Sequence, residues 1–345
     1  MLAFRLQALG ARVVLADPAG LGDNASGVAA GMLAPAMEAV LDPASADHFA
    51  LLRDARDAWP ALAAELERHG GILDRAGALW VGDEPSQLEV AARLAGVGAR
   101  TERVTERQAA GLSAGLAAPL GGVFTPEDWR LEPIAMLQAL RAAFLSVGGE
   151  VEADALVGLK AGAAVFGGGR RREADAVVLA TGRLPHGLEI RLGPASLRPI
   201  KGQIARSTSL PTGGPSVRAD GIYVAPSPSG AVIGATMEPD LADRVVDPEA
   251  IAQLRRRASG LFPHLRTASL QGAAGVRAAT PDGLPLVGRS GEEGAMLALG
   301  ARRNGWLLAP LIAEILAGEL AGDAPGPWKA ALDPVRLSGS TRTSD

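Results

Sequence analysis

Cysteine is absent from the 345-residue sequence. Its absence excludes disulfides, thiolate metal ligands and a cysteine nucleophile, and it suits a reducing cytoplasm, where we expect this protein to reside. Histidine is scarce, and the four histidines lack the spacing of metal ligands: His48, His69, His186 and His264. We therefore predict no metal site, so that any redox chemistry requires an organic cofactor.

A surplus of positive charge is also missing. The sequence has 34 basic and 38 acidic residues, a net charge of −4 and a pI near 5.7, so we expect neither nucleic acid nor an anionic membrane as a partner. No apolar run is long enough to span a bilayer, and the first nine residues lack the features of a signal peptide. With 48% apolar residues, the chain is expected to form one or two globular domains that bind a small molecule.

The beginning of the chain resembles part of a nucleotide-binding unit. Apolar residues at helical spacing over 1–9 predict a helix, and Arg12–Leu15 predicts a strand that ends at Asp17. In a dinucleotide-binding βαβ unit, an acid at this place binds the adenosine ribose, although a solvated strand-end acid is the simpler interpretation. The GxGxxG loop that would receive the pyrophosphate does not occur. We expect Met1 to fall within the first helix of such a unit and Val13–Asp17 to lie beside an open edge.

Later segments predict two interleaved domains. Helices are expected where apolar residues recur at three- and four-residue spacing, over Asp47–Gly70, Pro133–Gly148 and Trp306–Leu320. Strands are expected over Ile72–Gly82, Gly121–Thr125, Leu197–Ser207, Gly221–Ala225, Ala231–Met237 and Met296–Leu299. The apolar run Ala176–Gly182 follows a hairpin at glycines 167–169 and predicts a strand buried on both faces, whose small-residue end lets a ligand approach the backbone.

Nine motifs occur in an order that resembles the glycine oxidase branch of the D-amino-acid oxidase superfamily, over nearly the whole chain. They are AAGMLAP (29–35), GALWVG (77–82), RLEPIAMLQAL (130–140), VVLATG (177–182), RPIKGQ (198–203), YVAP (223–226), VIGATME (232–238), GVRAATPDGLPLVG (275–288) and GARRNGWLLAP (300–310). Each motif is weak by itself, whereas their common order is specific.

The resemblance implies a mixed α/β fold. A Rossmann-like FAD-binding domain, lacking its first strand and GxGxxG loop, is expected over residues 1–70, 130–195 and 270–335. A mixed β-sheet substrate domain is expected over 71–129 and 196–269, and a disordered tail over 336–345. A homo-oligomer is compatible with such a substrate domain.

The resemblance also implies an FAD site, with Asp17 at the ribose, Val157 beside the adenine and the segment 301–307 near the isoalloxazine. The residues expected to bind FAD are Asp17, Pro18, Ala25, Ser26, Ala30, Gly31, Met32, Val157, Ala180, Thr181, Gly182, Ala301, Arg302, Arg303, Asn304, Gly305, Trp306 and Leu307.

For the substrate, the resemblance assigns Arg277 and Arg303 to the carboxylate of an amino acid, a task that suits planar, permanently charged guanidinium groups. Tyr223, Met237 and Met32 are expected to line the pocket. Structural ion pairs for the arginines and a core position for Met237 are the alternatives.

The implied reaction is FAD-dependent oxidation of glycine, sarcosine or a small D-amino acid to an imine and then to a 2-oxo acid and ammonia. Oxygen would serve as acceptor and yield hydrogen peroxide, with a role in thiamine biosynthesis. No catalytic acid or base is expected, because the cofactor carries the chemistry. Two other functions stay open: a D-amino-acid or secondary-amine dehydrogenase that uses a quinone, and an FAD-free remnant with a binding role. The sequence departs from the usual family pattern at Ala301, Arg302 and Ala278.

Overall fold

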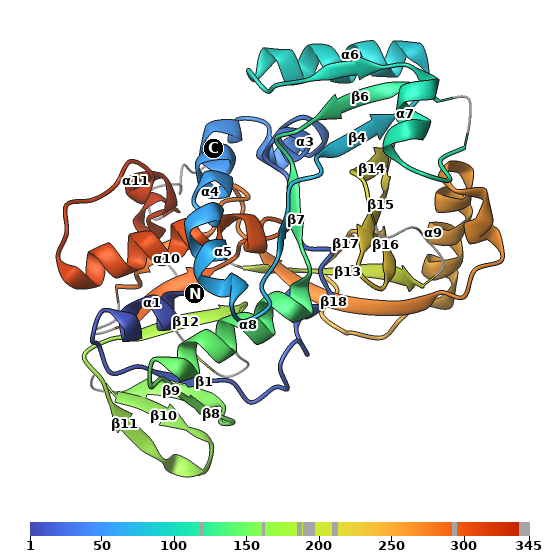
Figure 1. The fold of residues 1–345 in the computed structure, drawn as a ribbon. Helices are drawn as coiled ribbons and strands as arrows, with labels where there is room; N and C mark the ends of the chain where they lie inside the picture. Colours follow the sequence, from blue (N-terminus) through green and yellow to red (C-terminus); the bar gives the residue numbers. More distant parts are fainter. Residues whose placement is uncertain are drawn as a thin grey trace, which may run out of the picture.

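The computed structural model describes residues 1–117, 120–160, 163–184, 188, 197–208, 213–291 and 295–337. Helices α1, α4, α5, α8, α10 and α11 lie on one side of the molecule, and the large sheet lies on the other with α6, α7 and α9 packed around it (Figure 1). The long strands β13 and β18 run side by side. His186 and residues 338–345 of the expected tail lie outside the described residues.

The helical side contains two short parallel pairings. Strand β1 (Val14–Ala16) pairs with β8 (Glu150–Glu152), and β12 (Val177–Gly182) pairs with β20 (Ala295–Leu299), which continues antiparallel to β19 (Leu286–Arg289). Within the described residues, β1 has no strand on its other edge, so the expected strand beside an open edge is present.

Five helices bury the core of this side. They are α1 (Leu2–Ala8), α4 (Phe49–Asp57), α5 (Trp59–Glu67), α8 (Pro133–Ser146) and α10 (Gly305–Ala321). Their apolar faces meet around fully buried Trp59, Leu66 and Met136, and α1 packs against both α8 and α10. Shorter elements close the C-terminal part: α11 (Lys329–Leu332) and the 3₁₀ turn Pro334–Leu337.

A separate small sheet lies beside β8 (Figure 1). Its strands β9 (Leu156–Lys160), β10 (Ala163–Phe166) and β11 (Arg171–Glu173) are antiparallel, and the tight turn at Gly167–Gly169 joins the last two, as the sequence predicts. Another three-stranded sheet links the two sides of the molecule through β2 (Met32–Leu33), β7 (Trp129–Leu131) and β3 (Leu73–Asp74).

The large sheet has nine strands. Their order is β17 (Glu238–Pro239), β13 (Arg198–Ser207), β16 (Gly230–Gly234), β15 (Ile222–Ser227), β14 (Ser216–Ala219), β4 (Ala78–Val81), β6 (Gly122–Thr125) and β5 (Glu102–Val104), and β18 (Gln271–Ala279) pairs with the other edge of β13. Alternate side chains enter two different clusters, because successive residues of a strand point to opposite faces. Val224 and Ile233 belong to the cluster beneath α9 (Pro248–Leu261), whereas Tyr223 and Val232 belong to the cluster that faces Val28 and Met32.

Several expected elements differ from the structure. The helix predicted over Asp47–Gly70 is divided into α4 and α5 at Ala58, and Pro60 occupies the first turn of α5, where its missing N–H costs nothing. The strand predicted over Ile72–Gly82 is split between two sheets, because Gly77 has a φ of 85°. The strand predicted over Ala231–Met237 ends at Gly234.

The prediction that Ala176–Gly182 is buried on both faces is wrong. Only Leu179 of β12 is buried, and the last three residues are exposed, because β12 has a strand partner on one edge only in the described part of the chain. Residues 336 and 337 were predicted to start the disordered tail, but they belong to the last 3₁₀ turn, where Leu337 is buried. The boundary expected at 270 does not follow the sheet, since β18 pairs with β13 along nine residues.

Among the helices of seven or more residues in the described ranges, the sequence-based predictions missed α3 (Pro35–Leu41), α6 (Glu84–Gly96), α7 (Glu106–Leu112) and α9 (Pro248–Leu261). Three of them carry recognisable starts, since Asp83, Thr105 and Asp247 accept hydrogen bonds from the first backbone N–H groups. None of the helices in the described ranges combines the length and apolar character that a membrane span requires.

Candidate active site

The face of the large sheet opposite α9 carries a row of functional side chains. Arg218 of β14 lies opposite Tyr223 of β15, which lies opposite Gly234 of β16, and Gly234 in turn lies opposite Ile204 of β13. Cross-strand partners point to the same face of a sheet. The register therefore places Arg218 and Tyr223 on one side of the sheet, two strands from the edge where β13 meets β18.

Arg277 joins the same face from β18. It lies opposite Ile200 of β13. Ile200 and Ile204 lie an even number of positions apart along the strand, so their side chains point to the same face. The pKa of Tyr223 is raised by burial, so its hydroxyl stays protonated at neutral pH and can donate a hydrogen bond. Burial lowers the pKa of Arg277, although the guanidinium group remains charged.

Arg277 differs from the other arginines of the site in its partners. Its Nη1 donates to Sδ of Met237 at 3.3 Å. In the ranges that the structure describes, no carboxylate lies within ion-pair distance of Arg277. Arg277 therefore has no ion-pair partner among the described residues, although Glu38 contributes negative charge to the same site.

Glu38 supplies the negative charge of the site. It extends from α3 and is 4% exposed, and its Oε1 accepts from Nη1 of Arg218 at 2.9 Å. Its Oε2 lies 3.1 Å from Nε of Arg303. Burial by itself would raise the pKa of Glu38, but Arg303 and Arg218 together hold it below its ordinary value. Arg303 thus has a carboxylate partner already, whereas Arg277 has none.

Arg302 points to a different acid. It forms an ion pair with Asp42, which is 4% exposed and also accepts from the hydroxyl of Ser45 at 3.1 Å. Its backbone adopts a φ of 47°, in the left-handed region, as the chain passes from the bridge between Ala279 and Ala301 into α10. The side chain of Arg302 therefore serves a structural ion pair.

The segment Ala25–Met32, which is expected to bind FAD and is called the flavin segment below, is held by two distant side chains, Arg206 and Trp306. Helix α2 (Ala25–Val28) begins at Asn24, whose Oδ1 accepts from the N–H of Gly27 at 3.1 Å. At its other end, Nη2 of Arg206 donates to the carbonyls of residues 27, 28 and 29 at 3.1–3.4 Å. Nε1 of Trp306 donates to the carbonyl of Ser26 at 3.0 Å. These bonds fix the small-residue segment against β13 and α10.

The residues expected at the adenosine end lie elsewhere. Asp17 follows β1 and its Oδ1 accepts from the N–H of Ala19 at 3.0 Å. Val157 on β9 is 48% exposed and Leu15 on β1 is 40% exposed, which is high for apolar strand residues. That the adenosine of FAD binds at these exposed residues stays a prediction.

The remaining residues predicted to bind FAD fall into two groups, one at the ends of β12 and β1 and the other at the start of α10. Ala180, Thr181 and Gly182 form the exposed end of β12, and Pro18 is exposed after β1. Asn304 starts α10, whose first turn contains Trp306, while the Leu307 side chain is fully buried in the core and leaves only its backbone for a ligand.

Close packing tests whether FAD fits these residues. A Cβ on Gly275 of β18 would lie 3.3 Å from Val28 and 3.4 Å from Ala25, so the segment rests directly on the sheet. A Cβ on Gly31 would lie 2.1 Å from the carbonyl oxygen of Leu131. Small residues thus hold the backbone of 25–32 close to both sheets, as a site that receives a cofactor against the backbone requires. Ala16, Ser26 and Ala180–Gly182 are exposed, and their small side chains leave the backbone accessible, which fits a cofactor such as FAD.

Five important residues were missed by the predictions from sequence: Glu38, Asp42, Asp128, Arg206 and Arg218. Glu38 was detectable as the one acid in the otherwise apolar run PAMEAVL, and a charge inside such a run calls for a partner. The arginines gave no signal, because their partners lie more than 170 residues away in the chain.

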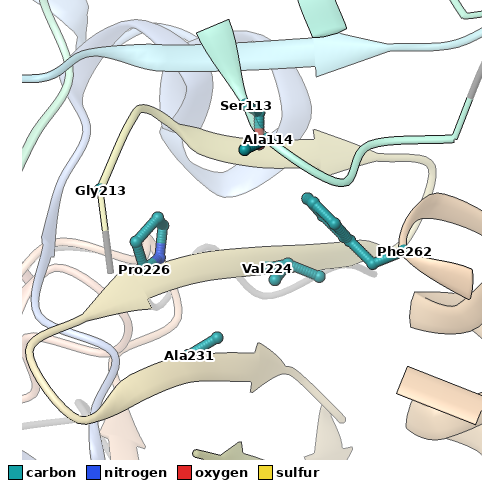
Figure 2. Close-up of a pocket in the computed structure, with 7 residues that line it drawn as sticks. All are labelled: Ser113, Ala114, Gly213, Val224, Pro226, Ala231 and Phe262. Carbon is teal, nitrogen blue, oxygen red and sulfur yellow. The ribbon is translucent and has the colours of Figure 1, made fainter. Parts of the chain in front are cut away.

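A second hollow lies on the opposite face of the sheet (Figure 2). Ser113, Val224, Ala231 and Phe262 are among the residues that line it, and its volume is about 10 Å³. Such a space accommodates about one water molecule. Because Val224 and Tyr223 point to opposite faces, this hollow is separate from the site around Arg277.

Residues 1–319 match the family described as FAD dependent oxidoreductase, known as DAO. The chain belongs to this family, and it is an FAD-dependent oxidoreductase. The glycine oxidase of Geobacillus kaustophilus is 30% identical over 330 residues, which cover 89% of this chain and 85% of that protein. Its crystal structure covers 100% of this chain and 95% of its own, at 26% identity and a TM-score of 0.80.

Two further relatives are informative. The bifunctional tRNA 5-methylaminomethyl-2-thiouridine biosynthesis protein MnmC of Caulobacter sp. is 39% identical over 183 residues, which cover 50% of this chain and 29% of that protein. The iminodiacetate oxidase of Chelativorans sp. BNC1 has a TM-score of 0.84 at 22% identity, covering 96% of this chain and 95% of that one. The latter shows a shared fold.

Proposed function

We propose that this enzyme oxidises a small amino acid, namely glycine, sarcosine or a small D-amino acid, and uses oxygen as acceptor. The observation that carries the proposal is Arg277, a guanidinium group without a carboxylate partner in the described chain, beside Tyr223 on the sheet face toward the flavin segment. An α-carboxylate is the anion that such a group binds in a bidentate manner. The similarity to glycine oxidase supports the same substrate class.

Each charged group of the site has its own task in this proposal. Arg277 binds the carboxylate, since Arg303 and Arg218 are already paired with Glu38. Arg303 adds positive charge near the carboxylate, and its ion pair with Glu38 holds its guanidinium group in place. The neutral hydroxyl of Tyr223 can donate a second hydrogen bond to the same carboxylate. Fixing the carboxylate fixes the orientation of the Cα–H bond, which is the main catalytic contribution of the protein.

FAD, when bound, supplies the redox chemistry: it takes a hydride equivalent from the substrate Cα and passes two electrons to oxygen, which becomes hydrogen peroxide. The imine that the substrate becomes is hydrolysed by water to a 2-oxo acid and ammonia, or methylamine when the substrate is sarcosine. The residues of the chain bind, orient and exclude water. None of them has to remove a proton from Cα, which agrees with the composition of the site.

Secondary amines belong among the candidate substrates. The name of MnmC contains a methylaminomethyl group, and the chain is more identical to MnmC over half of its length than to glycine oxidase over the whole. Sarcosine carries the same type of amine next to a carboxylate. We include the thiamine pathway as the proposed physiological role, to be tested by restoring thiamine-independent growth to a strain without its own glycine oxidase.

The test is an anaerobic titration of the FAD-loaded protein with glycine, sarcosine and D-alanine. We expect at least one of them to bleach the flavin absorption band at about 450 nm. R277M is expected to lower kcat/KM by about 100-fold, since it removes a charged bidentate contact, while R289M, at an exposed ion pair, leaves it unchanged. Bleaching by none of the three amines would refute the proposal. Reoxidation by quinones but not by oxygen would replace the oxidase with a dehydrogenase.

A further inference from the structure

A glycine lies directly beneath the guanidinium group of Arg277. Gly202 of β13 pairs with Gly275 of β18, two residues before Arg277, and all three lie on the same face of the sheet. A Cβ on Gly202 would lie 2.3 Å from Nη1 and 2.6 Å from both Cζ and Nη2 of Arg277. The guanidinium group therefore rests on the strand at a position where any side chain would displace it.

The backbone does not explain this glycine. Gly202 sits within the longest strand of the sheet, in the middle of its regular pairing with β18, and its φ lies outside the left-handed region. Alanine can adopt this conformation without strain, and glycine inside a strand is less favourable than alanine. The space taken up by Arg277 is thus the physical reason for glycine at position 202.

The same arrangement recurs along this face. A Cβ on Gly234 would lie 2.3 Å from Oη of Tyr223, so a second glycine lets the other group of the proposed carboxylate site lie against the sheet. Gly234 also pairs with both Ile204 and Tyr223 across the neighbouring strands. The two glycines thus allow both groups to lie close against the sheet.

We propose that Gly202 is a positioning residue that sets the height of the Arg277 guanidinium group above the sheet, and thereby the place of the substrate carboxylate. This inference rests on the proposed function in one respect, the identity of the anion. The three atoms nearest to a Cβ at position 202 all belong to the far end of the flexible Arg277 side chain, so the fold can accommodate this Cβ while Arg277 moves. A shift of the carboxylate by about 1 Å can cost about 100-fold in rate.

The experiment is a double-mutant cycle on the full-length, FAD-loaded protein. The four proteins are the wild type, G202A, R277A and the double variant, and the readouts are the melting temperature and the dissociation constant of acetate, followed by the flavin spectrum. We expect G202A to weaken acetate binding at least about tenfold and to raise KM more than it lowers kcat. We expect it to lower the melting temperature with Arg277 present and to leave it unchanged in the R277A background.

Gly260 provides the matched control. It lies in α9 with no atom within 4 Å of its Cβ position and no left-handed φ, so G260A tests the effect of a glycine-to-alanine change by itself. We expect G260A to leave acetate binding unchanged. Equal effects of G202A with and without Arg277 would overturn the inference, as would unaltered acetate binding in G202A.

The cycle also separates the two proposals. If none of the three amines reduces the flavin, the proposed substrate class is wrong, while the melting-temperature cycle still reports whether Gly202 acts through Arg277. If the amines do reduce the flavin and the two substitutions prove additive, the proposed function stands and the role of Gly202 is refuted.

Discussion

Oε2 of Glu38 lies 3.1 Å from Nε of Arg303, although Glu38 lies on α3 and Arg303 lies just before α10 in a distant part of the chain. The same carboxylate accepts a hydrogen bond from Arg218. One acid therefore holds two arginines of the site, and it does so from a buried position. The arginine without such an acid, Arg277, is left to bind the substrate in our proposal.

The substitution E38Q tests this arrangement. It keeps the shape of the side chain but leaves two cations without their anion, so we expect a loss of about 3 kcal/mol in the free energy of unfolding near pH 7. Because the pKa of Glu38 is lowered in the folded state, its stabilisation is present above the ordinary value of 4.5 and is lost as the pH falls. Urea denaturation at several pH values measures both effects.

An exposed acid serves as the control for E38Q. Glu84 pairs with Arg103 at 3.6 Å, and both side chains are largely exposed, so E84Q is expected to change stability by less than about 0.5 kcal/mol. Equal effects of the two substitutions would show that Glu38 contributes no more than a surface ion pair.

Asp128 predicts a second dependence on pH. Its carboxylate is 2% exposed and accepts from the N–H groups of Ala36 and Met37 at 2.9 and 3.2 Å, at the start of α3. Burial raises its pKa to about 6 from 3.8, with Arg218 opposing the shift and Glu38 adding to it. An acid with a raised pKa stabilises the fold when protonated, and this contribution disappears as the pH rises from about 4 to about 6.

We expect D128N to remove this part of the pH dependence. The wild type should lose on the order of 2 kcal/mol of stability, relative to D128N, between about pH 4 and about pH 6.5. Denaturant titrations of the two proteins across this range measure the difference. A constant difference at all pH values would mean that the pKa of Asp128 is the same in the folded and unfolded states, because the hydrogen bonds from α3 offset the effect of burial.

Arg206 is predicted to affect cofactor affinity without touching the substrate. R206M removes the donor to the last carbonyls of α2, so we expect the dissociation constant of FAD to rise about tenfold, measured by flavin fluorescence on the apoprotein. Arg255 is the matched control, because its Nη1 also donates to three backbone carbonyls, of residues 265, 266 and 268. R255M should lower stability and leave FAD affinity unchanged.

Gly31 is predicted to be essential for the fold of the flavin segment. It has a φ of 73°, and a Cβ would lie 2.1 Å from the carbonyl oxygen of Leu131, a backbone atom that cannot move freely. G31A is therefore expected to cost about 2 kcal/mol or more in the free energy of unfolding. G20A, at a glycine with no neighbour within 4 Å and no left-handed φ, should cost less than about 0.5 kcal/mol. Thermal denaturation compares the two, and equal values would contradict the prediction.

Much of the fold was predictable because the signals are local. The helix over Pro133–Ser146 follows from apolar spacing and a proline in its first turn, and the strand over Arg198–Ser207 follows from its pattern and flanking turns. The division of 47–70 at Ala58 was not predicted, since apolar spacing continues across the break. The exposure of the end of β12 was not predictable either, because it depends on which strands pair with it.

The sequence by itself determined the family and the cofactor, since the order of the nine motifs can be recognised without knowing any contact between residues. It also singled out Arg277 and Arg303 as arginines of the site. Only the tertiary structure showed that Arg303 is paired with Glu38 while Arg277 is not, and that Gly202 lies beneath the latter. The physical reason is that charge pairing and steric contact depend on distances of a few ångströms between residues far apart in the chain, and these distances exist only once the sheet has formed.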